Sequence, residues 1–296
     1  MMNFRTAMLF PFCAIVLWAG NVIVSKLSAS SIDPSAITFY RLVLALCLMS
    51  PFMLRPVWHN RSVIRRCLPQ LAFLGFLSMA LFQSLSYLAA HSTSATNMAI
   101  VTALTPLITM LLSILLIRET PTLGMIAGGA LALAGLTYLL SQGQPGSIWR
   151  NGVHAGDLLM LLAASSYALY SVLLKRWNLP VRGWQSTYIQ AWAALLAMIP
   201  LMLQVPPGKA ALNPETIPLI LYAGSLASIL LPFLWMEGIK AISPNRCSLF
   251  MNLLPVLTAA IAISILGETL HAYHLIGGLA ALGGVLIAQL SSAGKH

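Results

Sequence analysis

The sequence predicts an all-α polytopic membrane protein with ten transmembrane helices, built from two inverted five-helix repeats. Three observations lead to this fold class: the composition, a succession of long apolar stretches, and a match between the two halves of the chain. Of the 296 residues, 59% are hydrophobic and 7% are charged, whereas a soluble domain has about 45–50% apolar and about 25% charged residues. The mean hydropathy of +0.87 therefore indicates a surface that mostly faces lipid.

A helix needs about 20 mainly apolar residues to cross the hydrocarbon core of a bilayer. Ten stretches of the chain meet this requirement, and in chain order they cover 7–26, 36–54, 69–89, 95–117, 122–140, 156–174, 184–204, 217–238, 245–266 and 271–290. The longest connections are 55–68 and 141–155, with 14 and 15 residues. The sequence therefore leaves no room for a soluble domain.

The basic residues give the chain a direction in the membrane. Sixteen Lys and Arg against six Asp and Glu give a net charge of +10. The basic residues lie mainly between the spans, where such residues orient a membrane protein. The positive charge therefore does not indicate nucleic-acid binding. Three lie on the far side from the N-terminus, namely Lys26, Arg150 and Lys209, and Arg41 lies just inside the second span. Twelve lie on the side of the N-terminus: Arg5, Arg55, Arg61, Arg65, Arg66, Arg118, Lys175, Arg176, Arg182, Lys240, Arg246 and Lys295. Both termini are therefore expected in the cytoplasm.

The two halves of the chain, 1–145 and 146–296, align without a gap at a shift of 149 residues. The matches include residue types that are scarce here: Pro51, Pro69 and Pro106 meet Pro200, Pro218 and Pro255, and Glu119-Thr120 meets Glu268-Thr269. Because each half holds five spans, an odd number, the second half must enter the membrane from the opposite face. Inverted repeats are typical of secondary transporters, which place their site at the repeat interface near the midplane. The pattern thus favours a carrier that works by alternating access.

Several motifs resemble the drug/metabolite transporter superfamily, specifically its ten-helix EamA-type branch. Two of them are short, Leu17-Trp18-Ala19-Gly20-Asn21 and Tyr40-Arg41. One long signature begins at Ser94-Ala95-Thr96-Asn97 and continues through Arg118-Glu119-Thr120. The other begins at Ser243-Pro244-Asn245-Arg246 and continues through Gly267-Glu268-Thr269. The resemblance covers essentially the whole chain. It implies a bacterial inner-membrane carrier, usually an exporter of amino acids or related small metabolites, without specifying the substrate.

Polar and aromatic side chains within the spans are the candidates for a substrate cavity. They concentrate in the first, third, fourth, sixth, eighth and ninth spans, which we expect to line it. Arg41 is the sharpest candidate, because a charge within a span tends to face an aqueous cavity; it suits a carboxylate or phosphate, with snorkelling to the interface as the alternative. The full candidate set is Trp18, Asn21, Arg41, Gln83, Tyr87, Asn97, Thr102, Tyr167, Tyr170, Trp235 and Asn252. Such a lining suits a zwitterionic or amphipathic small molecule.

Four further residues are assigned to shape and capping. Pro106 and Pro255 fall within the fourth and ninth spans, where proline kinks a helix and provides a bend for gating. Glu119 and Glu268 follow these spans, where a carboxylate suits the positive end of the next helix. The tenth and fifth spans are rich in glycine, which allows close helix packing.

Other functions have weaker support. A multidrug or toxic-compound exporter is the main alternative. An intramembrane enzyme is disfavoured because H-E-x-x-H, G-x-S-x-G and paired carboxylates within the spans are absent from the sequence. No carboxylate lies at the middle of a span, which argues against a central proton relay but leaves a peripheral carboxylate or His91 open. We expect no metal, cofactor or nucleic-acid partner, and a monomer or weak homodimer in the lipid bilayer.

Overall fold

The computed structural model of the protein describes residues 4–118, 122–144, 154–242 and 250–293. Within these ranges the regular elements are all helices. The first half forms α1 (Phe4–Ser28), α2 (Pro34–His59), α3 (Arg61–Arg66), α4 (Leu68–Gly75), η1 (Phe76–Leu81), α5 (Phe82–Ala89), α6 (Ala95–Ala103), α7 (Thr105–Ile117) and α8 (Leu123–Leu140). The second half forms α10 (Ala155–Trp177), α11 (Gly183–Met202), η3 (Pro207–Lys209), α12 (Thr216–Leu221), η4 (Tyr222–Leu230), α13 (Leu231–Ile242), η5 (Met251–Leu253), α15 (Leu254–Leu266) and α16 (Ala272–Ala293).

The protein is a multi-pass membrane protein. In the described ranges, eight helices are long and apolar enough to cross a bilayer, and Met251–Leu266 is a shorter apolar helix. The predicted span 184–204 corresponds to α11, which is not among the eight. Its 20 residues reach about 30 Å, but polar residues such as Gln185 and Gln190 lower its hydropathy. The apolar lengths alone therefore do not establish the predicted count of ten.

The sequence sets several helix ends directly. Asp33 precedes Pro34 and accepts a hydrogen bond from the Ser35 amide at 2.8 Å, which caps α2, as expected for aspartate before an N-terminal proline. At the other end of two equivalent helices, Arg118 after α7 and Gly267 after α15 both adopt a left-handed conformation, with φ of 59° and 66°. A left-handed residue is a common helix stop. The two positions are 149 residues apart, so the halves end these helices in the same way.

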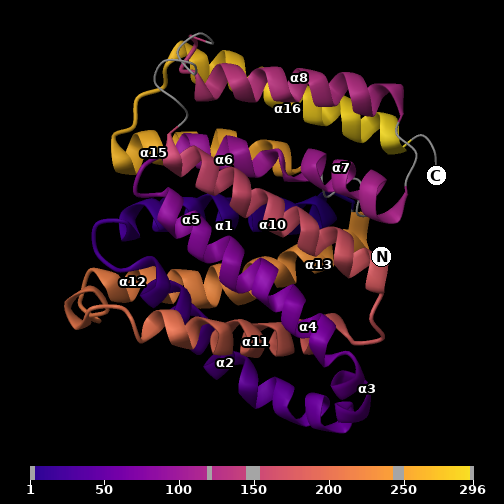
Figure 1. Cartoon of the computed structure of the whole chain (residues 1–296), viewed down its shortest axis with the longest axis vertical. Helices are drawn as coiled ribbons and strands as arrows, with labels where there is room; N and C mark the ends of the chain where they lie inside the picture. Colours follow the sequence, from indigo (N-terminus) through magenta and orange to yellow (C-terminus); the bar gives the residue numbers. More distant parts are fainter. Residues whose placement is uncertain (1–3, 119–121, 145–153, 243–249, 294–296) are drawn as a thin grey trace.

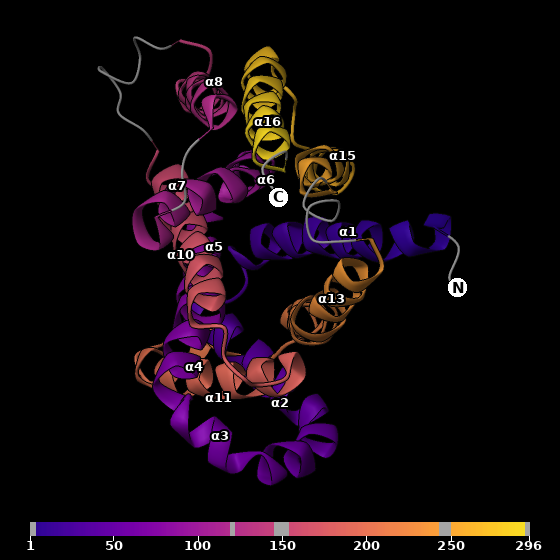
Figure 2. The same ribbon diagram turned by 90° about the vertical axis from the view of Figure 1, so that its right-hand side faces the viewer.

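The helices of the two halves interlock as a two-fold relation would require. Two pairs join repeat-equivalent elements: α2 with α11, and α8 with α16. Other contacts exchange with each other under the 149-residue shift: the contact of α1 with α13 exchanges with that of α10 with α5, and the contact of α1 with α15 exchanges with that of α10 with α7. Figures 1 and 2 show α8 and α16 side by side at one edge of the molecule and α3 at the opposite edge. The other long helices lie between them.

Glycine brings α8 and α16 into backbone contact. A Cβ added to Gly284 would come within 2.4 Å of the Gly128 carbonyl oxygen and of the Ala132 amide nitrogen. A Cβ on Gly128 would meet the Gly284 carbonyl oxygen at the same distance. Such approach is possible only without side chains, which is how small residues associate helices in lipid. The glycines of these two helices therefore form a packing seam.

Gly284→Ala is expected to lower the free energy of unfolding by about 1–3 kcal/mol, because the helices must move apart to admit the methyl group. Gly283→Ala is the matched control, since a Cβ there meets no atom within 4 Å and alanine favours the helix. Thermal unfolding of the two detergent-purified variants measures the difference. Equal midpoints would show that the seam does not depend on this close approach.

Candidate functional site

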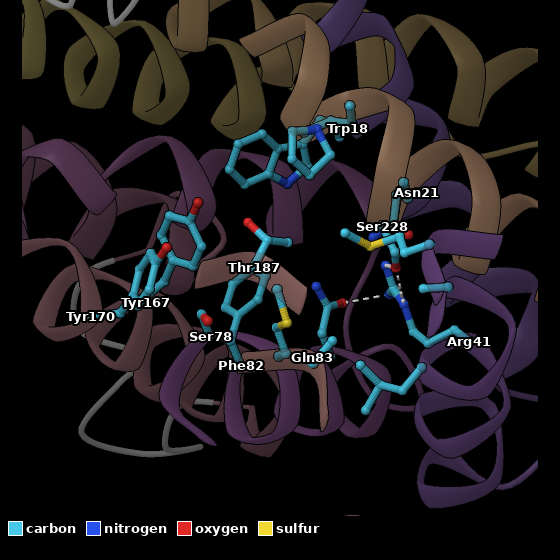
Figure 3. A pocket seen from close by; sticks show the side chains of 18 residues that line it. Trp18, Asn21, Arg41, Ser78, Phe82, Gln83, Tyr167, Tyr170, Thr187 and Ser228 are labelled. Atoms are coloured by element: carbon cyan, nitrogen blue, oxygen red, sulfur yellow. Dashed lines mark hydrogen bonds between the residues drawn. The ribbon is translucent and has the colours of Figure 1, made fainter. Parts of the chain in front are cut away.

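A cavity lies between the two halves, lined by residues of α1, α2, η1, α5, α10, α11, η4 and α13 (Figure 3). Its lining residues are Trp18, Asn21, Arg41, Leu42, Ala45, Met49, Ser78, Met79, Phe82, Gln83, Tyr167, Tyr170, Thr187, Ala191, Ala227, Ser228, Leu231 and Pro232. Both halves contribute. Residues of the first half and residues of the second half therefore form the cavity wall together.

Two π-helices contribute to the cavity wall. Residues 76–81 form η1 and residues 222–230 form η4, and the 149-residue shift places η1 within η4. Ser78 and Met79 of η1 and Ala227 and Ser228 of η4 line the cavity. π-Helical turns are rare and frequently occur at functional sites. Their presence at equivalent places in both halves associates this irregularity with the cavity.

Arg41 is a buried cation in the cavity wall, with 2% of its surface exposed. Its Nη1 donates to Gln83 Oε1 at 2.7 Å and to the Tyr87 hydroxyl at 3.1 Å. Its Nε and Nη2 donate to Ser228 Oγ at 3.1 and 3.0 Å. These partners are neutral and come from both halves, so they orient the guanidinium without cancelling its charge. Arg41 does not snorkel to the interface.

The cavity therefore has an unbalanced positive charge. Arg41 is the single charged side chain among the lining residues that the structure describes. A buried charge is costly unless an opposite charge compensates it. Figure 3 shows the guanidinium, Gln83 and Ser228 together on one side of the cavity, near Asn21. An anionic group that enters the cavity would supply the missing charge.

An aromatic wall lies across the cavity from Arg41 (Figure 3). The Tyr167 ring lies 5.9 Å from Trp18 in an edge-on arrangement, 5.1 Å from Phe82 and 5.3 Å from Tyr170. Trp18 and Tyr167 are repeat-equivalent, so the two halves meet at this cluster. Aromatic rings offer large apolar area together with polar edges. The cavity thus has a cationic side and an aromatic side.

One amide in the lining also has unused hydrogen-bonding capacity. Asn21 is 8% exposed, and its Oδ1 is buried without a hydrogen-bond partner. Buried polar atoms are almost always paired. This free acceptor beside Arg41 suits a donor such as a substrate ammonium or hydroxyl group.

The structure brings six of the eleven candidates to the cavity and places five elsewhere. The six are Trp18, Asn21, Arg41, Gln83, Tyr167 and Tyr170. Tyr87 is 1% exposed and supports Arg41 from behind. Thr102 donates to the Met98 carbonyl oxygen of its own helix at 2.7 Å, and Trp235 packs against the apolar core. Asn97 and Asn252 also lie outside the lining residues.

The expected set of lining spans is corrected in the same way. The predicted fourth and ninth spans supply none of the lining residues that the structure describes, whereas the second and seventh supply Arg41, Leu42, Ala45, Met49, Thr187 and Ala191. Most threonines of the fourth span bond to carbonyls of their own helix, as Thr109 does to Thr105 at 2.8 Å. Sequence reasoning missed Thr187 and Ser78; Thr187 had a signal in its alignment with Thr38.

The two candidate bend prolines begin new helical segments. The helix of the fourth span ends at Ala103, Leu104 interrupts it, and Pro106 is in the first turn of α7. The second half repeats the break, with Pro255 in the first turn of α15 after η5. Proline is tolerated in a first turn because its missing N–H has no partner there. Neither proline is among the residues that line the cavity.

A second polar cluster lies where α1 ends, at what we call the Lys26 end of the bundle. Lys26 Nζ donates to the carbonyl oxygens of Ala90 and Thr93 at 2.8 and 2.7 Å, so it is bound and does not snorkel freely. Asp157, at the start of α10, is 1% exposed. It accepts hydrogen bonds from Thr93 Oγ1 and, at 3.3 Å, from Asn97 Nδ2. Asp157 of the second half therefore holds the α5–α6 turn of the first half.

Glu268 makes another connection between the halves at this end. Its Oε1 accepts from the Ala95 amide at 2.7 Å, and its Oε2 accepts from the Thr96 amide at 3.3 Å and the Thr96 hydroxyl at 2.8 Å. It was expected to cap the helix that follows it in the chain, but it caps α6 of the other half. The dipole argument applies to any nearby helix N-terminus. The equivalent Glu119 lies outside the described residues.

The fold and the central cavity together define a membrane transporter of the drug/metabolite kind. The chain belongs to the EamA-like transporter family, which it matches over residues 5–141 and 154–290.

Individual relatives agree with this class. The chain is 26% identical over 90% of its length to the uncharacterized transporter YyaM of Bacillus subtilis, covering 87% of that protein. It is 25% identical to an uncharacterized transporter of Archaeoglobus fulgidus, with both chains fully covered. A probable terminal-alkyne amino-acid exporter of Streptantibioticus cattleyicolor is 23% identical over 78% of this chain and 76% of its own. A solved crystal structure shares the fold, with a TM-score of 0.63, 19% identity and 99% of both chains covered.

Proposed function

We propose that the protein is a secondary carrier that exports a small metabolite bearing a carboxylate, such as an amino acid or related compound, by alternating access. The observation that carries the proposal is Arg41, a buried cation with neutral partners on the wall of a cavity between the halves. The carboxylate binds Arg41, the free Asn21 Oδ1 accepts from the substrate ammonium, and the aromatic wall contacts the remainder. The exporter of Streptantibioticus cattleyicolor supports this substrate class.

The architecture in this proposal is a ten-helix bundle of two inverted repeats, with α11 and the η5–α15 segment completing the count. The exchange of contacts under the 149-residue shift supports the two-fold relation. Both termini lie in the cytoplasm, by the distribution of basic residues, and the membrane is the bacterial inner membrane. In alternating access the halves rock about the cavity, so the hydrogen bonds at the Lys26 end break when that end opens.

Transport into proteoliposomes tests the function. Purified protein is reconstituted, and radiolabelled amino acids and related carboxylates are screened against lipophilic cations. At least one carboxylate is expected to cross faster than in protein-free vesicles, whereas the cations are not, because Arg41 repels them. If the lipophilic cations alone crossed, the multidrug alternative would be correct. If none of the compounds crossed faster, the proposal would be wrong.

A further inference from the structure

A cluster of arginines lies on the surface where α2 ends, at what we call the Arg61 end. Arg55, Arg61, Arg65 and Arg66 fall within 12 residues, and His59 lies among them. No Asp or Glu occurs anywhere between Asp33 and Glu119. The segment therefore brings no carboxylate of its own to balance these charges.

The cluster is built on ordered helices. In α2 and α3, Val57 and Ile64 pack with Cys67, Leu71 and residues of the α10–α11 connection. The arginines face outward around two surface hollows, one lined by Leu54, Arg55, Trp58, His59 and Arg61 and the other by Val57, Arg61, Ser62, Ile64, Arg65, Arg66 and Leu68. Arg61 lines both hollows. Figures 1 and 2 show α3 at the edge of the molecule.

The guanidinium groups have almost no partners within the protein. Arg61 donates to the Trp58 carbonyl oxygen at 3.2 Å and lies over the Trp58 ring, 5.0 Å from its centre. Arg55, Arg65 and Arg66 make no hydrogen bond or ion pair with the described residues. Several N–H donors are thus directed away from the protein, although arginine geometry is well matched to phosphate oxygens.

Exposed apolar side chains place the arginines at the boundary between lipid tails and headgroups. Trp58 is 71% exposed, Phe52 is 72% exposed and Leu54 is 58% exposed. Such exposure in water would be unfavourable, whereas tryptophan and arginine together are typical of the membrane interface. The lipid phosphate groups lie at this depth.

We propose that the hollows around Arg61 bind the phosphodiester headgroup of an anionic phospholipid. Arg61 and Arg55, or Arg61 and Arg65, hold the phosphate while Trp58 and Leu54 contact the upper part of the acyl chains. The general preference for basic residues on one side explains their number but not their grouping around hollows. The repeat-equivalent positions Gln204, Ala210, Pro214 and Glu215 carry no basic residue, so the site is not a copy of a feature shared by both halves.

Native mass spectrometry of the full chain in detergent tests the proposal. The probes are phosphatidylglycerol and phosphatidylcholine with identical acyl chains. Phosphatidylglycerol is expected to bind more tightly, and Arg61→Gln is expected to weaken its binding about fivefold, the usual contribution of one basic residue near an anionic surface. Arg61→Gln with Arg65→Gln is expected to remove the preference for phosphatidylglycerol.

The control is Arg118→Gln, which removes the same charge from an exposed position directly after α7, an element remote from α3. An equal loss in this control would mean that net charge attracts the lipid, and the proposal would be wrong. Equal binding of the two lipids to the unmodified protein would also overturn it. Inorganic phosphate is added as a competitor in a separate arm. Complete displacement by millimolar phosphate would identify a site for free phosphate and contradict a lipid site.

Discussion

Arg41→Gln is expected to reduce transport of a carboxylate substrate severely while the protein remains folded. A hydrogen bond to a charged group contributes about 1.5–3 kcal/mol, so loss of the guanidinium is expected to weaken substrate binding about 10- to 100-fold. Glutamine can still bond to Gln83 or Ser228, the present partners of Arg41. Because the variant also removes an uncompensated buried charge, its thermal midpoint is expected to stay equal or rise. Proteoliposome transport and thermal unfolding measure the two effects.

The substrate can be altered in parallel to show which group Arg41 binds. A methyl ester of the transported compound lacks the negative charge, so the unmodified protein is expected to transport it as poorly as Arg41→Gln transports the acid. Combining the ester with the variant should add little further loss, because both changes remove the same interaction. If the loss of transport for the ester with the variant equalled the product of the two separate losses, Arg41 would not bind the carboxylate of the substrate. A variant that lost stability together with transport would indicate a structural role instead.

The sequence predicts the membrane helices well because their causes are local. Apolar length selects the spans, and turn residues set their ends, as Asp33-Pro34 does for α2. Hydropathy does not identify the span over 184–204, because Gln185 and Gln190 lower the value for this helix. Neighbouring groups bond to both side-chain amides: Gln185 donates to the Pro56 carbonyl oxygen and accepts from Asn60, and Gln190 donates to Ser186 while its Oε1 has no partner. Such contacts make a polar helix acceptable in the bundle and leave no mark in a hydropathy profile.

The cavity could be predicted in part. A charge within a span and repeat-equivalent aromatic residues identify Arg41, Trp18 and Tyr167 because these features are unusual in lipid. The π-helices η1 and η4 were not predictable, because no characteristic residue type or pattern in the sequence marks a one-residue change in helical register. The sequence does not distinguish Thr102, which bonds to its own helix, from a threonine that faces a substrate. The role of Asp157 was not predictable either, because this carboxylate lies at the start of a span and not at its middle.

Asp157→Asn is expected to shift the protein toward a conformation that is open at the Lys26 end. The carboxylate accepts from Thr93 and Asn97 across the two halves, and asparagine keeps its shape without its charge. If losing the charge costs the closed form about 1.5–3 kcal/mol, the ratio of open to closed forms rises about 10- to 100-fold. Ala45→Cys, placed in the cavity lining of a chain whose native cysteines are replaced by serine, reports the change. Its labelling by a membrane-impermeant maleimide added from the Lys26 side should become faster.

The matched control is Glu215→Gln, which removes a carboxylate from an exposed position beside α12 without breaking a side-chain contact between the halves. It should leave the labelling rate unchanged, so that surface charge alone cannot account for an effect at Asp157. Lys209→Cys, at an exposed position on the same end, verifies that the reagent reaches this side. Unchanged labelling in Asp157→Asn would mean that the contact with Thr93 and Asn97 does not control opening. Closure would then have to depend on the apolar packing around Tyr87 and Ile220. Removing the charge of Asp157 does not alter that packing.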